Sequence, residues 1–169
     1  MTSFKTLAAA AAITLTAGAA TANTIVDIAV ADERFSTLVA AVTAADLAET
    51  LAGPGPFTVY APVNEAFAAL PTGTVETLLL PENKGQLTDV LLYHVDDREL
   101  TASQFAPGAN YYKPVLASER LCITSHSGVS IADGTGDVAN VVIADIQASN
   151  GVIHVIDKVL LPGTRPDCH

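Results

Sequence analysis

The 169-residue chain carries 18 acidic against 8 basic residues, which gives it a formal net charge of −10. Nucleic acids and anionic membranes are bound through basic patches, so this charge balance argues against both as partners. The length is that of one domain, large enough to bury a substantial core.

Residues 1–22 have the pattern of a secretory signal peptide. Lys5 supplies a short positive start, residues 7–15 form an apolar stretch, and Ala20-Thr21-Ala22 places small residues before a cleavage point. The apolar stretch is too short to cross a membrane, and the sequence has no longer one after it. The sequence therefore predicts a soluble exported domain over residues 23–169, periplasmic or extracellular, with no transmembrane segment.

Helical patterns dominate the first half of this predicted domain. Thr24 is a candidate N-cap for a short helix over residues 25–29. An apolar stripe at helical spacing starts at Phe35, and Asn64 is a candidate N-cap for a later short helix. A further apolar stripe over residues 87–91 predicts a helix near the middle of the chain.

Strand patterns dominate the second half, after one early strand. The β-rich runs bounded by turn residues are 57–61, 111–116, 121–124, 129–132, 138–146 and 152–161. Asn150-Gly151, a pair that favours positive φ and tight hairpin turns, joins the last two runs, which we expect to pair antiparallel. The final run is apolar on both parities, which is typical of a strand covered on both faces. Helices first and strands later is the α+β pattern.

The two cysteines, Cys122 and Cys168, predict one disulfide, since paired cysteines are the rule in exported proteins. The bridge would tie the C-terminal tail to a middle strand. It would close a loop of about 47 residues, for which the chain-entropy model gives roughly 4 kcal/mol of stabilisation.

The sequence lacks the usual marks of an enzyme. It has no Gly-x-Ser-x-Gly elbow, no Gly-rich phosphate loop and no Cys-x-x-Cys. Its four histidines show no close metal-ligand spacing, and residues 133–137 have too few carboxylates for a calcium loop and predict a turn. Asp96-Asp97 is expected to be a solvated charged loop. We therefore expect no catalytic residue, no cofactor and no metal.

Four polar residues lie in apolar stretches, and three of them have a structural interpretation. His154 lies within the final strand, where its ring nitrogens must be satisfied internally. Asp157 follows in the same run, and because a buried carboxylate is costly without hydrogen bonds, we expect it to hold loop N–H groups. Tyr93, followed by His94, lies where the helix gives way to an extended segment; a tyrosine there buries its ring and finds a partner for its hydroxyl.

Three segments resemble the motifs of fasciclin-type (FAS1) domains. They are residues 57–70, residues 87–95 with the central Tyr-His pair, and residues 150–162, and they occur in the expected order and spacing. The resemblance spans nearly everything after residue 23. It implies an α+β fold: a β-sandwich or wedge of about seven strands with several helices, mostly N-terminal, packed on one side.

The resemblance also implies a function, a non-catalytic module for adhesion or interaction outside the cytoplasm. Its partner would be a protein or polysaccharide at a cell surface or in a matrix. In fasciclin-like adhesion proteins the Tyr-His segment is implicated in receptor binding, which makes Tyr93 and His94 candidate interaction residues. Asp145 and Ile146 resemble the Asp-Ile core of another adhesion motif of the family, although Ala144 stands where many members have a polar or basic residue.

Two other classes of function stay open. A small-ligand or carbohydrate-binding envelope protein would need a concave pocket lined with apolar and aromatic groups, and the absence of Trp disfavours sugar stacking. A hydrolase would need scattered His and Asp residues to converge on a nucleophile. Weak self-association could supply valency to a single interaction module.

Overall fold

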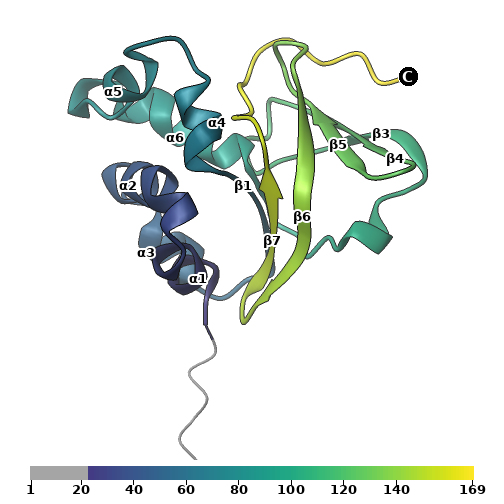
Figure 1. Cartoon of the computed structure of the whole chain (residues 1–169), viewed down its shortest axis with the longest axis horizontal. Coiled ribbons are helices and arrows are strands. Elements are labelled where there is room, and N and C mark those ends of the chain that lie inside the picture. The colour runs from purple at the N-terminus through teal and green to yellow at the C-terminus, as the bar shows by residue number, and fades with distance from the viewer. Residues whose placement is uncertain (1–22) are drawn as a thin grey trace, which may run out of the picture.

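The computed structural model describes residues 23–169, so the predicted signal peptide at residues 1–22 lies outside the described residues. Its helices and 3₁₀ turns are α1 (Ile25–Ala31), η1 (Glu33–Phe35), α2 (Ser36–Ala44), α3 (Ala48–Ala52), α4 (Asn64–Ala68), α5 (Thr74–Leu78), η2 (Pro81–Asn83), α6 (Lys84–Tyr93) and η3 (Ala102–Gln104). The strands are β1 (Phe57–Pro62), β2 (Val95–Asp96), β3 (Gly108–Tyr112), β4 (Leu121–Ser125), β5 (Val129–Ala132), β6 (Val138–Ala148) and β7 (Gly151–Ile156). Figure 1 shows the helices α1 to α6 gathered on one side of the strands.

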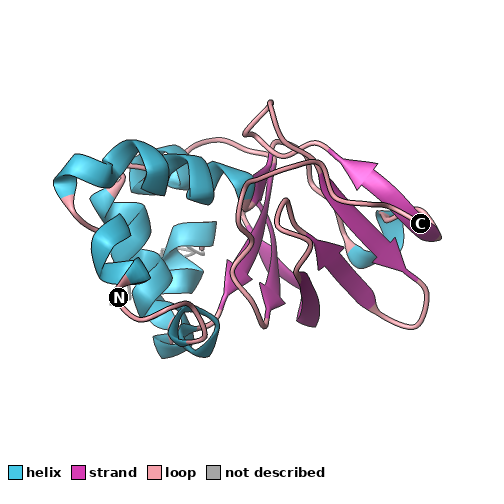
Figure 2. Ribbon diagram, turned by 90° about the horizontal axis from the view of Figure 1, so that it is seen from above, coloured by secondary structure: helices cyan, strands magenta, loops and turns pink. Residues whose placement is uncertain are grey.

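The seven strands form one mixed sheet in the order β2-β1-β7-β6-β5-β4-β3. The pair β1 and β7 runs parallel, and the other neighbouring pairs are antiparallel, including the predicted β6–β7 hairpin. The sheet curls, and Figure 2 shows its strands bending round on the side away from the helices. The predicted α+β fold with about seven strands is confirmed, with a single curled sheet as its β part.

The central strands carry core residues on both faces. On the helix side, Val59 of β1 and Ile153 and Val155 of β7 pack into a cluster with residues of α1, α2 and α6. On the other side, Tyr60 and Ile156 pack with side chains of β4, β5 and β6 inside the curl. All six residues of β7 are buried, which confirms that this strand is covered on both faces.

Several boundaries differ from prediction. The ladder of β7 ends at Ile156, five residues before the predicted end, although Val159 and Leu160 beyond it are still buried. The strand predicted at 111–116 is β3, which starts earlier, at Gly108, and also ends earlier, at Tyr112. Thr24 caps α1 as predicted, in a capping box with Asp27.

Asn64 does not cap α4. Val63 holds the N-cap position, and the Asn64 side chain reaches instead to the start of the neighbouring helix. Its Oδ1 accepts the N–H of Thr37 at 3.1 Å, and its Nδ2 donates to the carbonyl of Glu33 at 2.8 Å. The asparagine therefore joins two helical segments, a long-range role that the local capping pattern does not indicate.

Asn150 lies in the two-residue loop between β6 and β7, but not at positive φ, because the described non-glycine residues with positive φ are Asp46 and Asp145. A glycine is needed at position 151, where β7 meets β1, because a Cβ on Gly151 would collide with the carbonyl oxygen of Phe57. The hairpin prediction is confirmed, while the backbone conformation that motivated it is wrong for Asn150.

The predicted disulfide is present. Cys122 of β4 bonds to Cys168, with 5.5 Å between their Cα atoms. The tail that it holds also contacts β3: the Tyr111 hydroxyl donates to the carbonyl of Pro166 at 2.8 Å, and the Arg165 guanidinium lies 3.9 Å from the centre of the Tyr111 ring. The bridge and these contacts fix the C-terminal segment against the outer strands. Within residues 23–169, no helix is both long and apolar enough to cross a membrane.

Candidate interaction surface

The longest strand, β6, is irregular where it passes the middle of β7. Ile143 is paired with Val155, and Ile146 with Ile153. Two residues of β6, Ala144 and Asp145, therefore stand opposite the single residue His154. Such a bulge leaves backbone groups without ladder partners and turns side chains in new directions.

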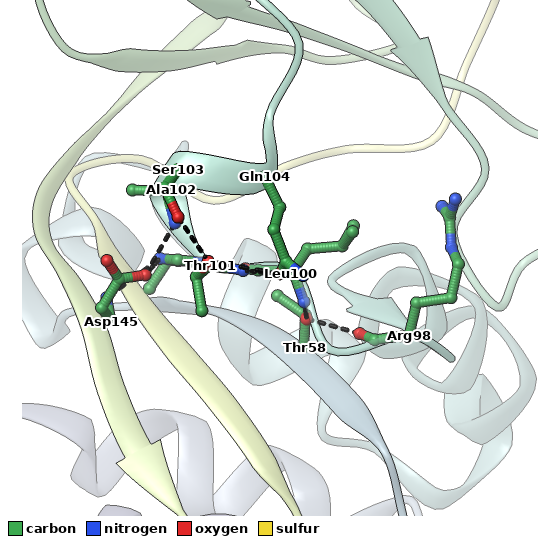
Figure 3. A network of polar contacts seen from close by, with 9 residues as sticks. Thr58, Arg98, Leu100, Thr101, Ala102, Ser103, Gln104 and Asp145 are labelled. Atoms are coloured by element: carbon green, nitrogen blue, oxygen red, sulfur yellow. Dashed lines mark hydrogen bonds and ion pairs between the residues drawn. The ribbon is translucent and has the colours of Figure 1, made fainter.

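Asp145 is the residue that the bulge displaces. Its φ of 58° lies in the left-handed region, which aspartate tolerates better than most residues. Its N–H, unable to join the ladder, donates to Nδ1 of His154 at 3.3 Å. Its carboxylate oxygen Oδ1 accepts the N–H of Ala102 at 2.7 Å, as Figure 3 shows. Asp145 thus joins β6 to the loop that contains η3.

His154 completes this link from inside the fold. The ring is fully buried, stacked on Tyr60 at 5.9 Å and against Phe105 at 5.5 Å between ring centres. Because Nδ1 accepts a backbone N–H, the proton of the neutral ring is on Nε2, which donates to the carbonyl of Leu100 at 2.6 Å. Burial lowers the pKa of His154, against the opposing effects of the Leu100 carbonyl and the Asp145 carboxylate. The prediction of an internally satisfied histidine agrees with this geometry.

The loop between β2 and η3 is held from the other side by β1. The Thr58 hydroxyl donates to the carbonyl of Arg98 at 2.5 Å and accepts the N–H of Leu100 at 2.8 Å (Figure 3). Asp96 was expected to be solvated, and that prediction is wrong: it is 1% exposed and forms a two-bond pair with the Arg98 guanidinium. Thr58 therefore holds residues 98–100 of this loop, and Asp145 on the bulge holds it at Ala102.

The outward side of the bulge is apolar with one carboxylate. Val142 is 56% exposed and Ile143 39% exposed, and Ala144 and Asp145 are also exposed. We call these four residues the β6 patch. Contiguous exposed apolar surface marks candidate contact sites, and Val142 and Ile143 are two of the six exposed large hydrophobic side chains among the described residues. Ile146, predicted to act with Asp145, is half-buried and packs toward the helix-side cluster.

Tyr93 and His94 lie elsewhere and are inaccessible. Tyr93 is fully buried, and its hydroxyl donates to the carbonyl of Arg120 at 2.8 Å. The His94 ring, 2% exposed, accepts the N–H of Leu160 on Nε2 at 2.8 Å, so its Nδ1–H donates to the carbonyl of Val90 at 2.7 Å. Burial lowers the pKa of His94 to about 4. A partner docked on the folded domain touches neither side chain.

Asp157 lies just after β7 and is half-buried. Its Oδ1 accepts the N–H of Asn140 at 2.7 Å, its Oδ2 accepts the Asn140 side-chain amide at 3.0 Å, and its own N–H donates to the Asn140 carbonyl at 3.2 Å. The groups it holds belong to strand β6 and not, as predicted, to a loop. The reciprocal bonds end the β6–β7 ladder at this point.

Besides Asp96, the fold buries a second carboxylate, Asp133, which sequence reasoning did not identify. It is 1% exposed and accepts hydrogen bonds from the N–H and hydroxyl of Thr135 and from the N–H groups of Asp137 and Leu161. The alternation of Asp, Gly and Thr in residues 133–137 is typical of a side-chain-stabilised turn, and this was the available signal. The bond to Leu161 connects that turn to the segment after β7.

A metal site would need a cluster of ligating side chains, and a carbohydrate site a cavity with aromatic lining. Residues 23–169 contain no group of three or more His, Cys, Asp or Glu side chains placed to hold a metal ion. A crevice of about 70 Å³ opens between α1, α2 and α3, and its lining is nearly all aliphatic. It has neither the size nor the aromatic lining that a carbohydrate site needs.

The sequence of this chain is similar to a known domain family and to several known proteins. The fasciclin domain family matches residues 33–162. The chain is 54% identical over 143 residues to protein sll1483 of Synechocystis sp., with 83% of this chain and 74% of that protein covered. It is 34% identical over 119 residues to the immunogenic protein MPB70 of Mycobacterium bovis, with 69% of this chain and 55% of that protein covered.

Longer animal proteins contain similar domains. Transforming growth factor-beta-induced protein ig-h3 of Sus scrofa is 41% identical over 140 residues, which cover 83% of this chain and 19% of that protein. A FAS1 domain pair from the insect cell adhesion molecule fasciclin I has the same fold, with a TM-score of 0.50 and 21% identity over 80% of this chain and 43% of that one. The chain belongs to the fasciclin domain family.

Proposed function

We propose that this chain is a non-catalytic adhesion or interaction module that works outside the cytoplasm, and that the β6 patch is its contact surface. The observation that carries the proposal is the exposure of Val142 and Ile143 beside Asp145 on a bulge whose backbone is held from within by His154. A fixed backbone favours binding because little conformational entropy is lost on association.

The chemistry of the patch indicates the kind of partner. Two aliphatic side chains next to a carboxylate suit a protein surface that offers an apolar contact beside a Lys or Arg side chain. The Oδ1 atom of Asp145 already accepts the Ala102 N–H, and among the described residues no hydrogen bond occupies Oδ2. The net charge of −10 would favour the approach of a basic partner.

The family supports the module and leaves the partner open. Fasciclin domains are linked to adhesion and cell-surface interaction, and members are generally non-catalytic. A disulfide between Cys122 and Cys168 suits an oxidising compartment, which supports the extracytoplasmic location, periplasmic or extracellular. One patch of this size predicts weak binding, so weak self-association or clustering on a surface would raise the avidity.

The test is binding of the purified protein to whole cells and to extracted envelope or matrix proteins and polysaccharides. The variant Val142→Ser with Ile143→Ser removes the apolar contact, and Asp145→Asn removes the charge while keeping an oxygen for Ala102. We expect each to weaken saturable protein binding by about tenfold or more, as central interface residues do.

The matched control is Val30→Ser, because Val30 is an equally aliphatic, 64% exposed residue on α1. Circular dichroism and urea unfolding must show all variants folded. Binding that survives both patch variants overturns the assignment of the β6 patch. Binding only to polysaccharide, or no binding to any surface, contradicts the protein-partner proposal and directs attention to the small-ligand alternative.

A further inference from the structure

We propose that the β6 patch is acid-sensitive: protonation of His154 exchanges its hydrogen bond with the Asp145 backbone for one with the Asp145 carboxylate, and this rearranges the patch. This inference rests on the proposed function for its biological meaning, since it describes regulation of the same surface. The structural rearrangement itself is independent of any partner.

The neutral ring of His154 is required by the observed contacts. The N–H of Asp145 can only donate, so Nδ1 must present a lone pair, while Nε2–H donates to the Leu100 carbonyl. A proton added to Nδ1 places two donors against each other at 3.3 Å. The Asp145 N–H bond is then lost, whereas the Leu100 bond is kept in both states.

An acceptor for the new proton is close. The Asp145 Oδ1 atom lies 4.0 Å from Nδ1, so a small movement of the side chain makes an ion pair between imidazolium and carboxylate. The other neighbours offer no competing charge: Tyr60 of β1 stacks on the ring as a neutral phenol, and Phe105 packs against it. Burial lowers the pKa of His154, so the change falls below the ordinary histidine range.

The exchange reaches the surface through Ala102. Its N–H now donates to the same Oδ1 atom, at 2.7 Å, and a carboxylate drawn toward the ring gives up that bond or distorts it. At the same time the positive φ of Asp145 loses the backbone contact that holds it. Both events loosen η3 from the bulge and change the path of residues 142–145, which are the β6 patch.

Nuclear magnetic resonance of the isotope-labelled protein tests this without a partner. Ring nitrogen shifts of His154 report its tautomer and titration, and hydrogen exchange reports the amides of Asp145 and Ala102. As the pH falls below the ordinary histidine range and the ring shifts report protonation of His154, we expect the protection factors of these two amides to fall by tenfold or more. The amide of Ile131, buried in β5, reports global unfolding, and the protection of Asp145 and Ala102 should stay below that of Ile131 at every pH, as local exchange requires.

Two variants make the outcome decisive. His154→Asn keeps an oxygen near the Nδ1 position and does not titrate, so the protection of Asp145 and Ala102 should become independent of pH. Asp145→Asn keeps the Ala102 acceptor but removes the anion, so Ala102 should stay protected even when His154 is protonated. If His154→Asn does not fold, the wild-type titration and Asp145→Asn still decide the question.

The results separate this inference from the proposed function. Protonation of His154 with unchanged Asp145 and Ala102 protection overturns the acid-sensitive exchange, whatever the binding assays show. Protection of Asp145 and Ala102 that converges on that of Ile131 also overturns it, because their exchange then reports global unfolding. A local change at Asp145 and Ala102 supports the exchange even if variants of the β6 patch bind normally, which would refute only the patch as a contact surface.

Discussion

The side-chain oxygen of Asn150 accepts the N–H of Ile25 at 3.0 Å, across 125 positions of sequence. The same side chain donates from Nδ2 to the carbonyls of Leu51 at 2.6 Å and Gly53 at 2.9 Å. One asparagine thereby supplies partners to the start of α1 and the end of α3, helix termini whose backbone groups lack intrahelical partners. It attaches both helices to the β6–β7 turn.

The first prediction follows from those three bonds. Replacement of Asn150 by Ala should lower the free energy of unfolding by roughly 2–4 kcal/mol, since each partly buried bond contributes on the order of 1 kcal/mol and the stranded groups add to the loss. Asn150→Asp should also destabilise, because a carboxylate cannot donate to Leu51 and Gly53. Urea unfolding measures both, with exposed Gln147→Ala as the control. A change below about 0.5 kcal/mol in Asn150→Ala would contradict the role.

The second prediction concerns pH and His94. Burial lowers the pKa of this ring to about 4, below the unfolded value of 6.5, so the folded state binds fewer protons between these two values. Stability is therefore full above pH 6.5 and falls as the pH drops toward 4. At 1.36 kcal/mol per pH unit, the largest loss from His94 is roughly 3 kcal/mol.

Urea unfolding at a series of pH values measures this loss. His94→Leu should be less stable at neutral pH, since it strands the Leu160 N–H, but its stability should depend less on pH in this window. His126→Gln, at an exposed histidine, should leave the wild-type pH dependence intact. Equal slopes for wild type and His94→Leu would show that the ring does not set the acid sensitivity.

The third prediction concerns the bridge between Cys122 and Cys168, whose sequence separation is 46. Replacing both cysteines by Ser should cost roughly 4 kcal/mol in the chain-entropy model. Thermal and urea unfolding of the oxidised protein and of the double variant measure the difference. Intact-mass analysis after thiol labelling should find no free thiol in the native protein, and two labelled thiols would rule the bridge out.

The fourth prediction concerns Asp157. Asp157→Ala removes both acceptors that hold Asn140 and should destabilise the domain by roughly 1–3 kcal/mol. Asp157→Asn keeps one acceptor for the Asn140 N–H and should lose less. The midpoint of urea unfolding measures both, and an unchanged midpoint in Asp157→Ala would refute the fastening role.

Local patterns in the sequence predicted local structure well. The Thr24 cap of α1 and the antiparallel β6–β7 hairpin depend on residues close in sequence, and both are present. The cysteine pair was predictable because the chain has only two cysteines. Tertiary partners were not predictable in this way. Asn64 and Asn150 look like capping and turn residues, yet their side chains serve helices far along the chain.

The candidate site shows the same limit. Asp145 and Ile146 are identified by resemblance, whereas Val142 and Ile143 lie at two register shifts of β6, which become visible only once β6 and β7 are paired. The sequence predicted a solvated Asp96 because Asp-Asp pairs usually lie in solvent. In the fold its side chain is buried and paired with the Arg98 guanidinium. Tyr93 and His94 were assigned by resemblance, while their burial depends on contacts with residues 120 and 160.

The parallel pairing of β1 with β7 has a consequence for biosynthesis. Residues 57–62 lie beside residues 151–156 at the centre of the sheet, so the core cannot close until nearly the whole chain has been made. Contacts of such long sequence range form late, because loop closure must precede them. The central sheet therefore cannot form while the chain is still emerging from the ribosome, whereas the N-terminal helices depend on contacts that are closer in sequence.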